Sequence, residues 1–245
     1  MALGIIDWGI GGISIYNRLK GQTPVIYFSD TGVTPYGKMS RQELVDRLNT
    51  VIAFLRSKGI THLVIGCNAA STAIPFLDRD TVPIEGVIDA AVETSTKLKP
   101  SRLGLIGGRR TVVSGVYRDA FKRRGVEVSQ RIAQPLSGLI ESGDISSDRL
   151  HDECRRILAP LKNCSHILLA CTHYPAIEPV LRKFVSESTQ FIDPADALVK
   201  RIAKWKLGER SGGDIFFTSG DAVAMKKAAK TAFDCRIQKV LKVSI

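Results

Sequence analysis

Short runs of apolar residues alternate along the whole chain with longer stretches in which apolar positions recur every three or four residues. The short runs are rich in Val, Ile and Leu, and each is bounded by polar residues or glycine, which is typical of buried strands. The strands predicted in this way are 3–6, 25–28, 62–66, 103–106, 126–129, 166–170, 191–192 and 215–217.

The stretches between these runs have a helical period. In 41–58 the apolar residues fall on one face of a helix, as an amphipathic helix requires. The other predicted helices are 111–124, 147–161 and 195–205. Alternation of strands and helices indicates an α/β fold with mainly parallel sheets flanked by helices. Ligands of such sheets bind beyond the carboxyl ends of the strands.

One apolar run occurs twice. His62-Leu-Val-Ile-Gly-Cys67-Asn68 returns about a hundred residues later as His166-Ile-Leu-Leu-Ala-Cys171-Thr172, and each copy ends in a cysteine beside a small polar residue. Two further segments repeat in the same order: 3–6 resembles 103–106, and 87–89 resembles 191–193. Buried strands all tend to look alike, but the cysteines make a chance match a poor explanation. We therefore infer an internal duplication.

The duplication predicts two pseudo-symmetric domains with a site in the cleft between them. The apolar pattern is interrupted at 97–102, which places the boundary there. Chain beyond 206 has no counterpart in a third half, so we expect it to return to the first domain. The predicted domains are 1–96 with 207–245, and 97–206.

Composition limits the class of protein. The chain has 245 residues, of which 44% are hydrophobic, and its apolar runs are too short and too interrupted to span a bilayer. The N-terminus lacks the features of a signal peptide. Five cysteines without a CxxC pair indicate reduced thiols in the cytoplasm.

A formal net charge of +11 distinguishes the surface. Basic pairs and triplets occur at 109–110, 122–124, 155–156 and 226–227. Such a surface could attract nucleic acid, but no nucleic-acid recognition motif accompanies it. We therefore favour a solvated basic surface that also attracts acidic substrates, and we expect no specific nucleic-acid partner and no membrane.

The repeated cysteines suggest acid–base chemistry at carbon. A thiolate on one face of a carbon can accept a proton while a thiol on the other face donates one, provided that nearby groups position them. Asp7 ends the first strand and His173 follows Cys171 by two residues. A zinc ion shared by Cys171 and His173 would need a further ligand pair that the sequence does not offer, so we expect no metal.

Several motifs that include these residues resemble the conserved blocks of glutamate racemases. They are 6–12, 35–37, 67–71, 139–141, 170–175 and 217–221, and they span nearly the whole chain in the family's order. The resemblance implies a cofactor-independent, two-domain amino-acid racemase of the aspartate/glutamate racemase superfamily, located in the cytoplasm and serving cell-wall peptidoglycan synthesis. It implies a small-molecule amino-acid substrate and is compatible with a homodimer.

The resemblance also implies roles for individual residues. Cys67 and Cys171 would be the two catalytic acid/bases, with Asp7 assisting Cys67, and His173 with Glu141 assisting Cys171. Substrate contacts would come from backbone amides at Tyr36 and Gly37 and from polar groups at Asn68 and Thr172. The full set of expected substrate-binding positions is Trp8, Pro35, Tyr36, Gly37, Asn68, Ala69, Thr111 and Thr172.

Two of these positions and one turn depart from the family pattern. Trp8 stands where the family has Ser, Ala69 where it has Thr, and the turn after 103–106 keeps only Thr111. Each lost hydroxyl removes a hydrogen bond worth about 1.5–3 kcal/mol to a charged group. Glutamate is therefore the first substrate to expect, with aspartate or another amino acid as the alternative. A catalytically silent binding protein is a second alternative.

Overall fold

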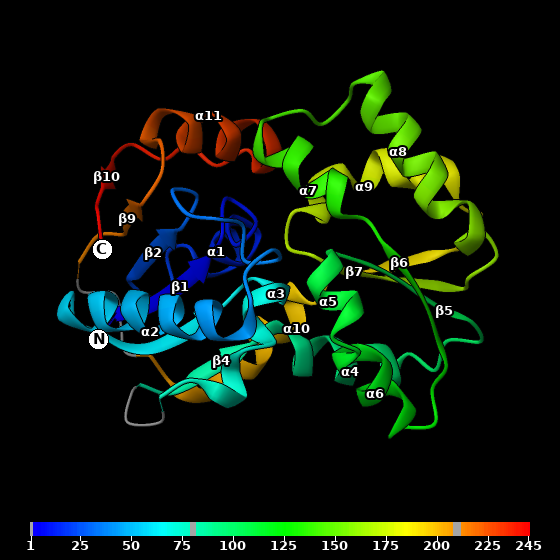
Figure 1. Ribbon diagram of the computed structural model, residues 1–245, viewed down its shortest axis with the longest axis horizontal. Coiled ribbons are helices and arrows are strands. Elements are labelled where there is room, and N and C mark those ends of the chain that lie inside the picture. Colours follow the sequence, from blue (N-terminus) through cyan, green and yellow to red (C-terminus); the bar gives the residue numbers. More distant parts are fainter. Residues whose placement is uncertain (1, 79–81, 208–211) are drawn as a thin grey trace.

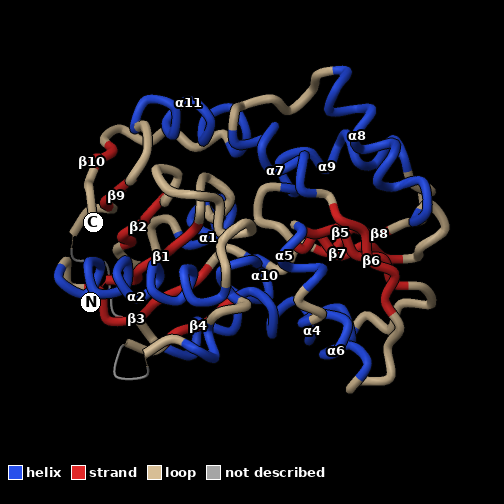
Figure 2. The backbone as a smooth tube through the Cα atoms, viewed as in Figure 1, coloured by secondary structure: helices blue, strands red, loops and turns tan. Residues whose placement is uncertain are grey.

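The computed structural model describes residues 2–78, 82–207 and 212–245. Their strands form two separate sheets, and every paired strand in the described chain runs parallel to its neighbour. Figure 2 shows the sheets as two groups of strands with helices around each. This is the α/β architecture that the alternating pattern predicted. None of the described helices is both long and apolar enough to cross a membrane.

The first sheet has the strand order β10-β9-β2-β1-β3-β4. Its strands are β1 (Ala2–Asp7), β2 (Val25–Ser29), β3 (Ile60–Ile65), β4 (Ile84–Gly86), β9 (Ile215–Thr218) and β10 (Val240–Lys242). The second sheet has the order β6-β5-β7-β8. Its strands are β5 (Leu103–Gly107), β6 (Val128–Ile132), β7 (His166–Ala170) and β8 (Gln190–Ile192).

The two sheets share one core arrangement, because β2-β1-β3-β4 corresponds to β6-β5-β7-β8. The register also matches: Leu3 pairs with His62 in the first sheet, and Leu103 pairs with His166 in the second. An internal duplication predicts this correspondence. The sequence match of 87–89 with 191–193 does not join equivalent elements, because 87–89 begins α4 whereas 191–192 lies in β8.

Helices cover the faces of both sheets (Figure 1). They are α1 (Ile13–Leu19), α2 (Arg41–Ser57), α3 (Asn68–Ser71), α4 (Val87–Lys97), α5 (Arg109–Val113), α6 (Val116–Lys122), α7 (Gln134–Glu141), α8 (Asp148–Leu158), α9 (Glu178–Leu181), α10 (Ala195–Ile202) and α11 (Ala222–Phe233). Short 3₁₀ turns follow or link several of them: η1 (Ile74–Phe76), η2 (Ala159–Leu161), η3 (Tyr174–Ile177), η4 (Arg182–Phe184) and η5 (Ala203–Trp205).

The helix expected at 41–58 is confirmed in detail. Ser40 and Glu43 form a reciprocal capping box at its start. The apolar residues that suggested the helix all lie on its buried face: Leu44, Val45, Leu48, Val51, Ile52 and Leu55.

The prediction of a single helix at 111–124 is wrong, because two helices, α5 and α6, cover this stretch. Gly115 interrupts it with a left-handed φ of 73°, and α6 begins at the next residue. The strand expected at 126–129 begins two residues later, and the short edge strands β4 and β10 were not predicted. Three-residue edge strands have too little apolar pattern to stand out from a loop.

The C-terminal segment returns to the first sheet, where β9 pairs with β2 and β10 pairs with β9. In Figure 1 this orange-to-red segment lies beside the blue N-terminal strands. Phe216 packs against Tyr16 and Tyr27, with ring centroids 5.0 and 5.8 Å apart. The domain boundaries at 96/97 and 206/207 stay a prediction.

Candidate active site

One pocket lies where the carboxyl ends of β1, β3, β5 and β7 approach each other. It is a small cavity of about 50 Å³ that residues from both sheets enclose. The residues that line it are Asp7, Trp8, Pro35, Tyr36, Gly37, Cys67, Asn68, Ala69, Gly108, Thr111, Gln134, Ser137, Ala170, Cys171, Thr172 and His173. The structure thus brings together every site residue expected from the sequence except Glu141, which lies behind His173.

Cys67 comes from the first half of the chain. It follows β3 after one glycine and is the N-cap residue of α3, so its thiol stands at the end of the strand. Burial, followed by the negative charge of Asp7, raises the pKa of this thiol well above its usual value. Cys67 is therefore a protonated thiol at neutral pH.

Cys171 comes from the second half and begins a chain of three side chains. Its Sγ lies 3.7 Å from His173 Nδ1, and His173 Nε2 lies 2.7 Å from Glu141 Oε2. Burial alone would lower the pKa of His173, but hydrogen bonds to Cys171 and Glu141 raise it well above its usual value. A positively charged imidazolium therefore faces the sulfur of Cys171.

Glu141 is anchored from both halves. Besides contacting His173, its Oε2 accepts a hydrogen bond of 2.9 Å from the backbone N–H of Ile10. This approach requires Gly9, because a Cβ there would lie 2.0 Å from the same oxygen. The glycine-rich turn after β1 is thus shaped to receive a carboxylate of α7.

Asp7 is fully buried at the end of β1. Its Oδ2 accepts a hydrogen bond of 2.8 Å from Thr172 Oγ1, which again joins the two halves. Oδ1 is buried and has no hydrogen-bond partner within the described residues. Burial raises the pKa of this carboxyl to about 6, against the lowering effect of His173.

Asn68 presents an unused donor in the same pocket. Its Oδ1 accepts a hydrogen bond of 2.6 Å from the hydroxyl of Tyr117, which fixes the orientation of the amide. Its Nδ2 is buried and without a partner in the part of the chain that the structure describes. A buried donor of this kind is costly unless a ligand satisfies it. Thr111 lies buried on the opposite side, at the start of the second sheet's first helix.

The loop 35–37 forms another wall. The hydroxyl of Tyr36 donates to Asp30 Oδ2 at 2.7 Å, and Arg47 and Ser219 hold Asp30 in turn. Because the hydroxyl of Tyr36 is already hydrogen-bonded to Asp30, this loop can contact a ligand through its backbone groups. Trp8 is half-buried beside it, and its indole N–H donates to the carbonyl of Val33 at 3.4 Å.

Two polar residues of the pocket, Gln134 and Ser137, were not predicted from the sequence. Gln134 Nε2 donates to Ser137 Oγ at 3.1 Å, while Gln134 Oε1 accepts from the backbone N–H of Arg109 at 3.0 Å. Both precede Glu141 on α7 at spacings that place all three on one helix face. That spacing was the available signal, and it went unused. Gly108 and Ala170 also line the pocket without having been predicted.

Other reactive residues lie elsewhere. All five cysteines are free, and Cys154, Cys164 and Cys235 are buried away from the pocket. His62 packs against Trp205 with the two rings tilted and their centroids 4.8 Å apart. Across the described ranges, no three His, Cys, Asp or Glu side chains are grouped to hold a metal ion.

The arrangement supports proton transfer on two sides of a small ligand. The thiol of Cys171 faces the imidazolium of His173, and the thiol of Cys67 lies beside the carboxylate of Asp7. Both charged side chains are buried. Both cysteines line this one pocket, and a negative charge on Cys171 would add to the burial that raises the pKa of Cys67. A ligand between them would meet a proton acceptor on one face and a donor on the other.

Comparisons with known proteins point to racemases. The family model for Asp/Glu/Hydantoin racemases matches residues 16–202. A glutamate racemase of Bacillus cereus is 31% identical over 98% of this chain and 95% of its own. One of Aquifex aeolicus is 33% identical over 89% of each chain. The crystal structure of the Thermus thermophilus glutamate racemase in complex with β-chloro-D-alanine matches with a TM-score of 0.85 and 27% identity, covering 100% of this chain and 97% of that one.

Proposed function

Because the chain belongs to the Asp/Glu/hydantoin racemase family, we propose that it interconverts the L and D forms of glutamate by proton transfer between Cys67 and Cys171. The observation that carries the proposal is the placement of these cysteines. They follow equivalent strands, β3 and β7, and line one pocket from opposite halves of the chain. No cofactor is needed for this chemistry.

In the proposed reaction, a thiolate at Cys171 takes the α-proton from one face of the substrate. The C–H electron pair remains on the α-carbon and is delocalised into the carboxylate. The thiol of Cys67 then donates its proton to the opposite face, which leaves Cys171 protonated and Cys67 as the thiolate. The reverse turnover starts from that state.

The neighbouring groups account for this starting state. The imidazolium of His173, held by Glu141 at 2.7 Å, stabilises negative charge on Cys171. The carboxylate of Asp7 disfavours negative charge on Cys67, and its unpartnered Oδ1 is available to take up the proton of that thiol. Asp7 and His173 are thus positioned to manage the protons of the two cysteines.

The substrate's polar groups match the unused groups of the pocket. The Nδ2 of Asn68 can donate to the α-carboxylate, with Thr172, Thr111 and the backbone of Tyr36 and Gly37 as further contacts. A cavity of about 50 Å³ favours a compact amino acid over a larger ligand.

A second candidate changes only the substrate. Trp8 lines the pocket with its indole N–H already bonded to Val33, so it adds bulk without offering a donor. Ala69 likewise offers no hydroxyl. These two residues favour an amino acid with a shorter or less polar side chain, such as aspartate or a neutral amino acid.

The test is exchange of the α-proton in D₂O, followed by NMR for both enantiomers of glutamate, aspartate and a panel of neutral amino acids. We expect exchange with inversion on glutamate. Exchange on another amino acid alone would transfer the proposal to that substrate. Calorimetric binding without exchange on any of them would identify a catalytically silent binding protein and overturn the proposal.

The cysteine assignment has its own test. We expect Cys67→Ser and Cys171→Ser each to lower racemisation by at least about 10³-fold, because a hydroxyl is a far weaker acid than a thiol. Cys154→Ser, a buried thiol outside the pocket, serves as the matched control and should retain activity. Full activity of either pocket variant would contradict the two-base mechanism.

The cellular setting belongs to the same proposal. Five free cysteines suit a reducing compartment, so we place the enzyme in the cytoplasm. D-Glutamate produced there would serve peptidoglycan synthesis. Sedimentation would establish whether the active species is a homodimer.

A further inference from the structure

Three arginines lie at the entrance to the pocket. Arg41 begins α2 in the first half of the chain, and Arg109 and Arg110 begin α5 in the second. Together with Gly37, Val113 and Ser114 they line a hollow of about 390 Å³. Gly37 also lines the pocket that contains Cys67 and Cys171, so the hollow adjoins that pocket.

Unlike Arg47 and Arg201, these three arginines have no carboxylate partner among the described residues. Arg47 pairs with Asp30 at 2.6 Å and Arg201 pairs with Glu85 at 3.2 Å. The hollow, in contrast, has no Asp or Glu among the described residues that line it. No ion pair to a carboxylate is formed by any of its three arginines within the described ranges.

The arrangement is unfavourable without an anion. The positive charges come from two halves of the chain and repel each other, and burial together with the charge of Arg41 lowers the pKa of Arg110. Like charges gathered in a hollow produce a positive potential that a bound anion would relieve.

Two of the three guanidinium groups are already held in place. Arg110 donates from Nε to Thr72 Oγ1 at 3.1 Å and from Nη1 to the carbonyl of Met39 at 2.6 Å. The guanidinium of Arg41 lies over the ring of Phe76, 4.6 Å from its centroid. A group that is ordered before binding loses less entropy when it binds, and guanidinium groups match carboxylate and phosphate geometry.

We propose that Arg41, Arg109 and Arg110 form a binding site for an anionic group, a carboxylate or a phosphate, of a small molecule at the entrance to the active-site pocket. The group could belong to the side chain of an acidic amino-acid substrate or to a separate anion. Only the first of these sources rests on the proposed function.

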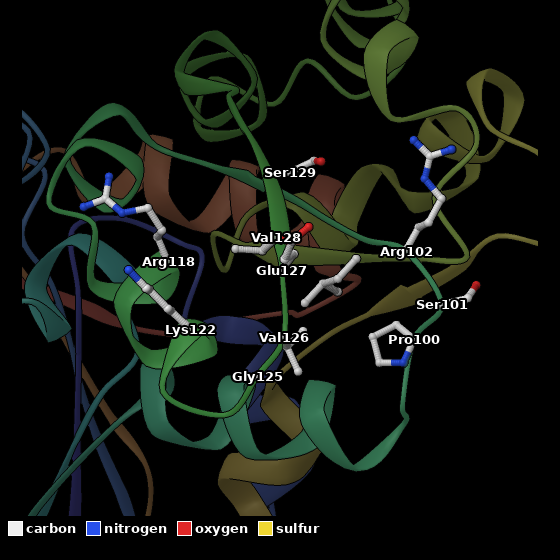
Figure 3. Close-up of a pocket in the computed structure, with 11 residues that line it drawn as sticks. Pro100, Ser101, Arg102, Arg118, Lys122, Gly125, Val126, Glu127, Val128 and Ser129 are labelled. Carbon is white, nitrogen blue, oxygen red and sulfur yellow. The ribbon is translucent and has the colours of Figure 1, made fainter.

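The direct test is a titration with inorganic phosphate at constant ionic strength, followed by NMR of the ¹⁵N-labelled protein. We expect Arg41→Gln with Arg109→Gln to weaken phosphate binding at least tenfold. The control is Arg102→Gln with Lys122→Gln, which removes the same charge from the groove beside β6 shown in Figure 3. That control should change binding less than twofold. Equal weakening in both double variants, or no phosphate binding to the wild type, would overturn the proposal.

Kinetics then distinguish the two sources of the anion. If the site holds the substrate's side chain, the entrance variant raises KM for an acidic amino acid at least tenfold and leaves KM for a neutral one unchanged. If it holds a separate anion, phosphate alters the wild-type rate without competing with substrate, and the entrance variant loses that effect. The phosphate titration needs no turnover, so it remains decisive if the proposed racemisation fails.

Discussion

Asp7 combines complete burial with a negative charge at working pH. Its pKa is raised from the usual 3.8 to about 6 because burial outweighs the attraction of His173. A carboxyl with a raised pKa accepts a proton more readily, and in the proposed reaction Asp7 takes up the proton that the thiol of Cys67 releases. The same burial makes it a source of instability in the folded protein.

We expect Asp7→Asn to stabilise the protein at pH 7.5 while abolishing most of its activity. Between the two pKa values the folded state binds more protons than the unfolded state, so stability falls as pH rises from about 4 to 6. The rise in the pKa of Asp7 corresponds to a loss of at most about 3 kcal/mol of folding stability at pH values above that window. Denaturant unfolding at pH 7.5 and pH 4 measures it.

The stabilising effect of Asp7→Asn should shrink toward zero at pH 4, where the wild-type carboxyl is protonated. Asp144→Asn is the matched control, because hydrogen bonds from Ser147 lower the pKa of this partly exposed carboxyl instead. It should not stabilise at either pH. A gain that is the same at both pH values would show that the charge of Asp7 is not its cause.

Much of the candidate site was visible residue by residue in the sequence. Cys67 and Cys171 could be predicted because each follows a strand-like run. Residues that follow parallel strands lie at the carboxyl edge of the sheet, where ligands bind. Gln134 and Ser137 gave no such signal, because they reach the pocket only through the way α7 packs across the two halves. Their spacing from Glu141, which places all three on one helix face, was the one signal of them in the sequence.

At the scale of elements, the turn between β1 and α1 packs closely against the second half of the chain. A Cβ at Gly11 would lie 2.3 Å from Thr172 Oγ1 and 2.7 Å from His173 Nδ1. The turn therefore needs glycine for space, so the glycines that follow Asp7 in this chain have a steric cause.

Gly11→Ala should lower kcat by at least about tenfold, since a shift of His173 by a fraction of an ångström misaligns it with Cys171. Gly138→Ala is the control, because Gly138 is an exposed residue of α7 with open space around its Cα. It should keep full activity and gain up to about 1 kcal/mol of stability. Racemisation rates and denaturant unfolding of both variants check this, and equal activity of the two would remove the steric argument.

Elements with a strong pattern were predicted well. The strand at 166–170 agrees at both ends, and α2 ends one residue before the predicted end. The errors occur where local signals compete: Ser114 and Gly115 interrupt a helical period that continues on both sides, and β4 and β10 are formed by pairing at sheet edges rather than by their own sequence. Tertiary contacts decide such segments.

For the whole molecule, the C-terminal segment completes the first half from a distance. Phe216 of β9 is buried between Tyr16 and Tyr27, although nearly two hundred residues separate it from them. We expect Phe216→Ala to cost about 3–5 kcal/mol of unfolding free energy, because it leaves a cavity in a packed aromatic cluster.

Phe216 does not line the pocket, so the folded variant should keep kcat within about twofold at low temperature. Val223→Ala, at a residue of α11 that is 72% exposed, should change stability by less than about 0.5 kcal/mol. Chemical denaturation of both variants makes the comparison. A Phe216→Ala protein as stable as the wild type would mean that the C-terminal segment is not part of the first half's core.

The two thiols of the pocket have unlike surroundings, an imidazolium on one side and a carboxylate on the other. The two enantiomers of an amino acid nevertheless have equal free energies in water, so their equilibrium constant is one. The Haldane relationship then requires kcat/KM to be the same in both directions. The chemical asymmetry of the site can appear only as a paired difference, in which the enantiomer that binds more tightly is turned over more slowly by the same factor.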